Sequence, residues 1–158
     1  MMKVMDASEV RERLKAAIAA FMTRDRYLLE CDLREECISA RLALHLQGAF
    51  EDYSVDVEYN RAGDLAKRLR LPEECAKKRD RDGRALVLPD IIVHQRGPHG
   101  PNVLVIEMKK TSNPLGFNCD RRRIQAFRDE FGYTFGAVLE CETRAGHEPH
   151  ILIVDWMQ

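Results

Sequence analysis

The sequence has no long hydrophobic run, no Cys-x-x-Cys pair and no excess of basic residues. No apolar stretch approaches the roughly 20 residues that a membrane span needs. The first residues, MMKVMD, do not form the continuous apolar region of a signal peptide. We therefore expect a cytoplasmic protein with no membrane partner. Without internal repeats or low-complexity tracts, the 158 residues are most simply one domain, residues 1–158, with a real core.

Two further absences limit the function classes. The five cysteines, Cys31, Cys37, Cys75, Cys119 and Cys141, show no zinc-ligand spacing, so we expect reduced, mostly structural thiols. The net charge of -1 provides no global positive field. This argues against a protein that coats nucleic acid through salt-driven contacts, although a local basic patch would suffice for a nuclease.

Apolar residues at helical spacing predict two helices in the first third of the chain. Val10, Leu14 and Phe21 belong to the first helix, which we interpret as an N-terminal helical addition within residues 1–30. The core is then expected from about residue 33 to residue 158. The second helix, predicted over residues 33–47, has an apolar stripe formed by Ile38, Leu42 and Leu46.

An acidic residue of the second helix faces the same way as this stripe. Glu35 stands three residues before Ile38 and seven before Leu42, so it lies on the core-facing side. Glu36 projects about 100° further round the helix. The pattern selects Glu35 as an inward carboxylate. The alternative is a first-turn glutamate that only complements the helix dipole.

The most informative segment is a predicted β-hairpin. LPDIIVH at residues 88–94 and VLVIEMKK at residues 103–110 flank a turn rich in Gly and Pro. A turn centred near Pro98 and His99 places Asp90 opposite Glu107, and directly opposed residues have Cβ atoms about 4.5–5.5 Å apart. Since side chains alternate along a strand, Lys109 shares the face of Glu107 and Met108 points away. His94 is expected on the face of Asp90.

Two opposed carboxylates repel each other unless a positive charge lies between them. A hard divalent cation meets this need, because Mg²⁺ is commonly held by one or two carboxylates with waters and substrate phosphates. Lys109 could then orient the attacking water or neutralise charge on a phosphate. The alternative is an ordinary charged strand end. The apolar runs around Asp90 and Glu107 favour a site, because such flanks indicate buried central strands.

With these residues in order, the chain resembles the PD-(D/E)XK nucleases, a superfamily with restriction-endonuclease-like folds. The matching residues are Pro89-Asp90, then Glu107-Met108-Lys109, with Glu35 as the match to the helix glutamate of many members. The resemblance covers residues 35–155, and within the superfamily the chain is similar to small bacterial members. It implies an α/β fold in which a mixed central sheet is flanked by helices, with an αβββαβ core.

The resemblance also implies a cofactor and roles for these residues. The expected cofactor is Mg²⁺, with Mn²⁺ as a substitute. Asp90, Glu107 and Glu35 would be metal ligands, with the main-chain carbonyl of Met108 as a further one. Lys109 would act on the nucleophilic water or on the charge of the transition state.

The rest of the chain supplies further elements. We expect strands at residues 54–60, 136–140 and 151–156, a short helix at 64–69, and an exposed charged connection at 72–83. Glu58 is either a further acid at the site or, as we expect, an exposed strand residue. Asp120 is predicted to cap a helix that ends at Gly132. Weak candidates for nucleic-acid contacts are Lys110, Arg121, Arg122 and Gln125, since a helix N-terminus favours phosphate.

The predicted function is a metal-dependent nuclease that hydrolyses phosphodiester bonds of nucleic acid, most simply DNA. Two alternatives stay open: a catalytically silent binding or assembly module with the same fold, and a phosphodiesterase acting on RNA or nucleotides. A lone small nuclease needs specificity or control from elsewhere, so a homodimer or a partner protein is compatible with this interpretation.

Overall fold

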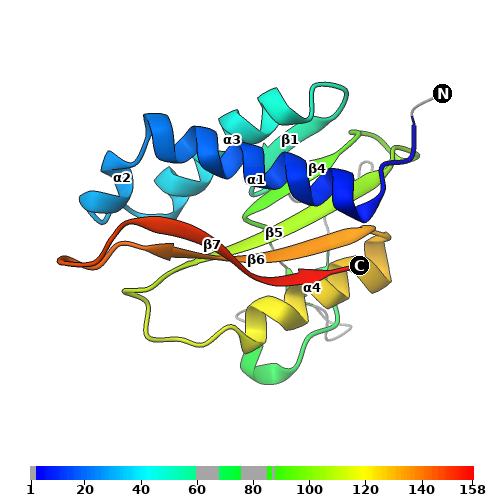
Figure 1. Ribbon diagram of the computed structural model, residues 1–158. Helices are drawn as coiled ribbons and strands as arrows, with labels where there is room; N and C mark the ends of the chain where they lie inside the picture. The colour runs from blue at the N-terminus through cyan, green and yellow to red at the C-terminus, as the bar shows by residue number, and fades with distance from the viewer. Residues whose placement is uncertain (1–2, 60–67, 76–84, 87) are drawn as a thin grey trace.

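The protein is described by a computed structural model in which residues 3–59, 68–75, 85–86 and 88–158 are placed. A five-stranded mixed sheet lies between two helical layers (Figure 1). The order of strands in this sheet is β1-β4-β5-β6-β7, and a separate two-stranded sheet pairs β2 (Arg68–Leu69) with β3 (Ala85–Leu86). The predicted α/β class with a mixed central sheet and flanking helices is therefore confirmed at this level.

One helical layer contains α1 (Ala7–Arg24), α2 (Tyr27–Glu30) and α3 (Glu35–Ala49). The side chain of Asp6 caps α1 by accepting a hydrogen bond from the Glu9 amide at 2.8 Å. Val10, Leu14 and Phe21 of α1 are fully buried and belong to the same core cluster as Leu42 of α3. The first helix thus contributes directly to the main core.

The central strands bury both faces. In β4 (Ile91–His94), Ile91 and Val93 pack toward α1 and α3, whereas Ile92 packs in the cluster on the opposite side. The same alternation continues in β5 (Asn102–Lys110), where Met108 belongs to the α1 and α3 cluster. This burial on both faces explains the continuous apolar runs in the sequence.

The strands connect in both orientations. β1 (Ser54–Val57), shorter than predicted, pairs antiparallel with β4, and β4 pairs antiparallel with β5. β6 (Phe135–Glu142) runs parallel to β5, and β7 (His150–Met157) closes the sheet antiparallel to β6. The crossover from β5 to β6 passes through α4 (Asn118–Phe131) on the other face of the sheet (Figure 1).

Close packing fixes α4 against the sheet. Ile124 and Phe127 are fully buried, and a Cβ at Gly136 of β6 would collide with the Ile124 side chain. Gly132 ends α4 in the left-handed conformation (φ 69°), as its place in the sequence predicts. Asp120 is not the cap that we expected. The helix begins at Asn118, and Asp120 lies inside its first turn with a side chain that points toward β5 and is 2% exposed.

Between β1 and β4 only part of the chain is described. Of the short helix expected at residues 64–69, Arg68–Leu69 forms β2 and the rest lies outside the described residues. Of the connection expected at 72–83, Glu73–Cys75 forms a 3-10 helix, η1. No helix in the described ranges is long and apolar enough to span a membrane.

Cys75 of η1 and Cys119 of α4 form a disulfide across 44 residues of sequence. The expectation of reduced thiols is therefore wrong for this pair. Sequence spacing gives no signal for it, because the two cysteines meet only when η1 packs on α4. Cys31, Cys37 and Cys141 are free, and Cys141 is buried.

We expect reduction of the Cys75–Cys119 disulfide to lower the free energy of unfolding by about 4 kcal/mol, because it releases a closed loop of this length. Urea unfolding with and without reductant measures the difference. The double variant Cys75→Ser/Cys119→Ser should be insensitive to reductant, whereas Cys31→Ser should behave as wild type. Five titratable thiols in the oxidised native protein would contradict the pairing.

Candidate functional site

Asp90 and Glu107 lie opposite each other where β4 meets β5. Ile91 pairs with Ile106, and one step further along this antiparallel register Asp90 faces Glu107, as the hairpin pattern predicts. Pro89 has no amide hydrogen, and the chain bends at Asp90 just before β4 begins. The Asp90 carboxylate then accepts a hydrogen bond from the Met108 amide at 2.7 Å, so its side chain closes the end of the ladder.

The electrostatics of this pair are unfavourable without a cation. Burial raises the pKa of Asp90 to about 6, against the hydrogen bond from the Met108 amide, which lowers it. Burial and then the Asp90 charge raise the pKa of Glu107 well above its ordinary value. The interaction between the two carboxyl groups lowers the pKa of Asp90 and raises that of Glu107. Of the two, Glu107 is therefore the acid whose protonated form is favoured more.

One carboxylate oxygen of Glu107 is available as a ligand. The residue is 3% exposed, and among the residues that the structure describes its buried Oε1 has no hydrogen-bond partner. A buried polar atom without a partner costs about 1–3 kcal/mol, so its persistence at this place calls for an explanation. A cation beside Asp90 and Glu107 would satisfy this oxygen, and two carboxylates with waters suit Mg²⁺. The residues present fit such an ion.

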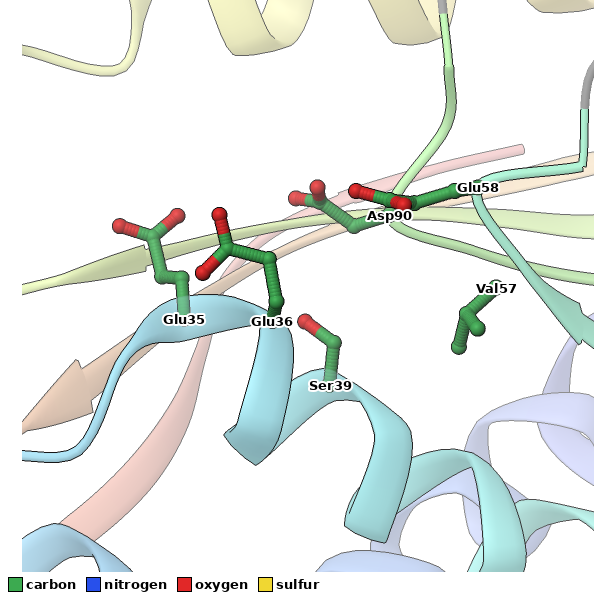
Figure 2. A pocket seen from close by; sticks show the side chains of 6 residues that line it. All are labelled: Glu35, Glu36, Ser39, Val57, Glu58 and Asp90. Carbon is green, nitrogen blue, oxygen red and sulfur yellow. The ribbon is translucent and has the colours of Figure 1, made fainter.

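An open pocket of about 120 Å³ lies beside Asp90. Figure 2 shows the carboxylates of Glu35, Glu36, Glu58 and Asp90 reaching into the same space from α3 and from the ends of β1 and β4. This volume has room for several waters.

Glu35 approaches the pocket from the first turn of α3. Burial raises the pKa of Glu35, and hydrogen bonds from the Lys110 backbone and the Asn113 side chain oppose that rise. Glu36 also lines the pocket, but it is exposed and its carboxylate lies 3.5 Å from the Arg34 guanidinium. Glu35 is thus the more buried acid of the two. Within the described ranges, no three His, Cys, Asp or Glu side chains are close enough together to hold a metal ion.

Glu58 is a pocket residue that the sequence interpretation placed in solvent. It is exposed as expected, but its backbone has φ 49°, a left-handed conformation that is uncommon for a residue with a Cβ. Its amide donates to the Pro89 carbonyl at 3.0 Å, which ties β1 to the segment that carries Asp90. This conformation points the Glu58 carboxylate toward Asp90 (Figure 2). The sequence gives no signal for this backbone conformation, because the residue is neither Gly nor Asn.

Lys109 lies on the same face of β5 as Glu107, but its ammonium already has partners. Its Nζ lies 2.6 Å from Asp120 Oδ2 and donates to the Gly116 carbonyl at 2.7 Å. Asp120 also accepts a 2.6 Å hydrogen bond from Arg123, whose Nε lies 3.7 Å from Glu107. Sequence reasoning missed both Asp120 and Arg123 as neighbours of the site. A signal for Asp120 existed, because it stands four residues before Ile124 and seven before Phe127, on the buried side of α4.

The remaining residues that the sequence suggested for the site do not line the pocket. His94 is buried and bonds Asp56 at 2.7 Å across β1 and β4. Lys110 donates to Asp32 and to the Leu33 carbonyl, each at 3.0 Å. Three candidates lie on the exposed side of α4: Arg121, which bonds Asp155 at 2.7 Å, Gln125, which bonds Asp129 at 2.8 Å, and Arg122.

Comparison of the chain with protein-family models, with curated proteins and with solved structures gave no match. The residues and their geometry therefore carry the functional inference alone.

From the raised pKa values of Asp90 and Glu107 we predict an unusual dependence of stability on pH. Both folded-state pKa values lie above those of the unfolded chain, so the native protein binds more protons and its stability falls as pH rises from about 4 through 6 and beyond. Glu107→Gln removes the buried acid. We expect it to raise the metal-free Tm by about 3–8 °C at pH 8 and to change it little at pH 4.

Calorimetry at both pH values with chelator present checks this expectation. Glu36→Gln is the matched control, because it neutralises an exposed carboxylate of the same pocket and should leave Tm nearly unchanged. A lower Tm of Glu107→Gln at pH 8 would show that the ionised carboxylate stabilises the fold, which is the opposite of the expected effect.

Proposed function

We propose that the protein is a Mg²⁺-dependent nuclease that hydrolyses phosphodiester bonds of nucleic acid, most simply DNA. The observation that carries the proposal is the facing pair of Asp90 and the buried Glu107, in which the pKa of each acid is raised and Glu107 Oε1 has no hydrogen-bond partner among the described residues. Asp90 and Glu107 would hold the cation, with the Met108 carbonyl as a further ligand and Glu35 acting directly or through water. Mn²⁺ would be an effective substitute.

The order of elements supports this proposal. α3, β1, β4, β5, α4 and β6 follow one another as helix, strand, strand, strand, helix and strand, with the short β2, η1 and β3 inserted. β1, β4, β5 and β6 are neighbours in the sheet in that order. This order of elements agrees with the αβββαβ arrangement that we expect of a PD-(D/E)XK nuclease, and the agreement supports the proposal.

The pocket charges indicate how a substrate would be bound. Four carboxylates around one opening repel a phosphate, so phosphate binding there requires a cation. A bound Mg²⁺ would polarise the phosphoryl oxygen and supply a water of lowered pKa. Lys109 would donate to the developing negative charge through an N–H group that does not bond the Gly116 carbonyl. Glu35 would orient water at the mouth of the pocket.

The silent-module alternative has one observation in its favour: Lys109 is paired with Asp120 rather than directed at the pocket. Such a module would keep the fold and bind a partner protein without cleavage. A nuclease in need of specificity would also use a second copy or a partner, so binding of a protein does not by itself distinguish the nuclease from the silent module. A cleavage assay distinguishes them.

We expect wild type to cleave DNA with Mg²⁺ or Mn²⁺ and not with chelator. Asp90→Asn, Glu107→Gln and Lys109→Ala should each lower kcat by at least about 100-fold, since each removes a group that acts on the developing charge. Lys109→Ala should keep metal binding, because a protonated amine cannot ligate a cation. A panel of single-stranded and duplex DNA, RNA and nucleotides at matched salt measures the rates.

The matched control separates the two neighbouring acids of α3. Glu35→Gln should lower the rate and Glu36→Gln should leave it close to wild type, because Glu35 is the more buried of the two. Cleavage of RNA or nucleotides in place of DNA would change the substrate and keep the site. Absence of metal-dependent cleavage across the whole panel, with a partner protein still bound, would favour the silent module.

A further inference from the structure

Asp120 is the centre of a buried network of charges between α4 and β5. Its side chain is 2% exposed, although carboxylates are almost never so buried without partners. Oδ2 lies 2.6 Å from the Lys109 ammonium, and Oδ1 accepts from Arg123 at 2.6 Å. Asp120 therefore faces one cation from the strand and one from its own helix.

The ammonium of Lys109 is held on two sides. Lys109 donates a hydrogen bond to the Gly116 carbonyl, its ammonium is ion-paired with Asp120 Oδ2, and the centre of the Phe117 ring lies 5.7 Å from it. Its side chain is 8% exposed. A long lysine side chain ordinarily rotates freely, so these contacts together favour one orientation of the ammonium.

Arg123 extends the network to the acidic pair. Its Nε lies 3.7 Å from Glu107 Oε2, too long for a hydrogen bond but close enough for an ion pair. Asp120 thus interacts with Lys109 of the proposed site and with Arg123, which lies beside Glu107 of the same site.

Stability alone is a poor reason for this network. A buried ion pair gains little net stability, and apolar side chains of similar volume often replace one without loss. Groups that orient functional residues, by contrast, matter for function because a displacement of about 1 Å can cost 100-fold in rate.

We propose that Asp120 is a positioning residue, which holds the Lys109 ammonium in the orientation that the reaction uses and, through Arg123, restrains Glu107. The inference rests on the proposed nuclease function and deepens it, because it assigns a role to a residue outside the Pro-Asp and Glu-x-Lys motif of the superfamily. Asp120 touches neither substrate nor metal in this role, and it acts only through Lys109 and Arg123.

The test combines kinetics with the mobility of one side chain. Asp120→Asn keeps the shape and removes the charge. We expect kcat on DNA to fall about 10–100-fold, as for other residues that orient a functional group, with KM within about twofold. In ¹⁵N-lysine NMR of the metal-free protein, the Lys109 ammonium should be rigid in wild type and mobile in Asp120→Asn. Lys109→Ala assigns the signal.

Two variants complete the design. Asp129→Asn, on the exposed side of the same helix, is the matched control and should change neither kcat nor the Lys109 signal. Asp120→Glu keeps the charge but moves it by one methylene, so its kcat should lie between those of wild type and Asp120→Asn. If Asp120→Asn does not fold, Asp120→Glu decides: a lower kcat with a more mobile ammonium supports the role, and a wild-type kcat overturns it.

The outcomes separate the two proposals. A rigid ammonium in folded Asp120→Asn, or a mobile one with wild-type kcat, would overturn the positioning role and leave the nuclease proposal intact. Wild type that cleaves no phosphodiester with either metal would overturn the proposed function, and with it this role of Asp120.

Discussion

Asp90 and the buried Glu107 face each other where β4 meets β5, and their ionised forms repel there unless a positive charge compensates. Burial and the Asp90 charge raise the pKa of Glu107 well above its ordinary value, which favours the protonated form. A divalent cation beside the pair would instead favour the ionised form, so this conflict would be resolved by release of a proton. The apolar strands around the pair, Ile91 and Ile106 among them, create the burial from which this conflict arises.

The charges around the pair are consistent with this interpretation. Around the pair lie the Asp120 carboxylate and the cationic side chains of Lys109 and Arg123. The Glu35 carboxyl also acts electrostatically on Asp90, and Lys109 acts on Glu35. A divalent cation beside Asp90 would add two positive charges, and loss of one proton from Glu107 would offset one of them. Metal binding and proton release should therefore be coupled at this site.

Much of the site could be predicted from the sequence because it depends on a hairpin. The Gly- and Pro-rich turn sets the register, and the register alone places Asp90 opposite Glu107. The end of α4 at Gly132 follows from local chemistry in the same way. The features missed depend on packing between distant segments. Asp120 is ion-paired with Lys109 of β5 only when α4 packs on the sheet, and Cys75 meets Cys119 only through η1.

Glu58 illustrates a second kind of feature that could not be predicted from the sequence. Its left-handed backbone follows from hydrogen bonds to the segment around Pro89, which no local pattern near Glu58 encodes. Such conformations cost about 1–3 kcal/mol and persist where the surrounding structure imposes them, often at functional sites. The helix glutamate Glu35 was placed at the pocket by helical periodicity, but the presence of Glu36 and Glu58 beside it required the tertiary structure.

The most direct test of the proposed metal site is a crystal structure of the protein grown with Mn²⁺ and recorded with anomalous scattering. We predict one strong anomalous peak between the Asp90 and Glu107 carboxylates, with oxygen ligands from both residues at about 2.0–2.6 Å. The same peak should vanish in Glu107→Gln crystals. Manganese bound only by the exposed acids Glu36 and Glu58, with Glu107 still protonated against Asp90, would contradict the central claim.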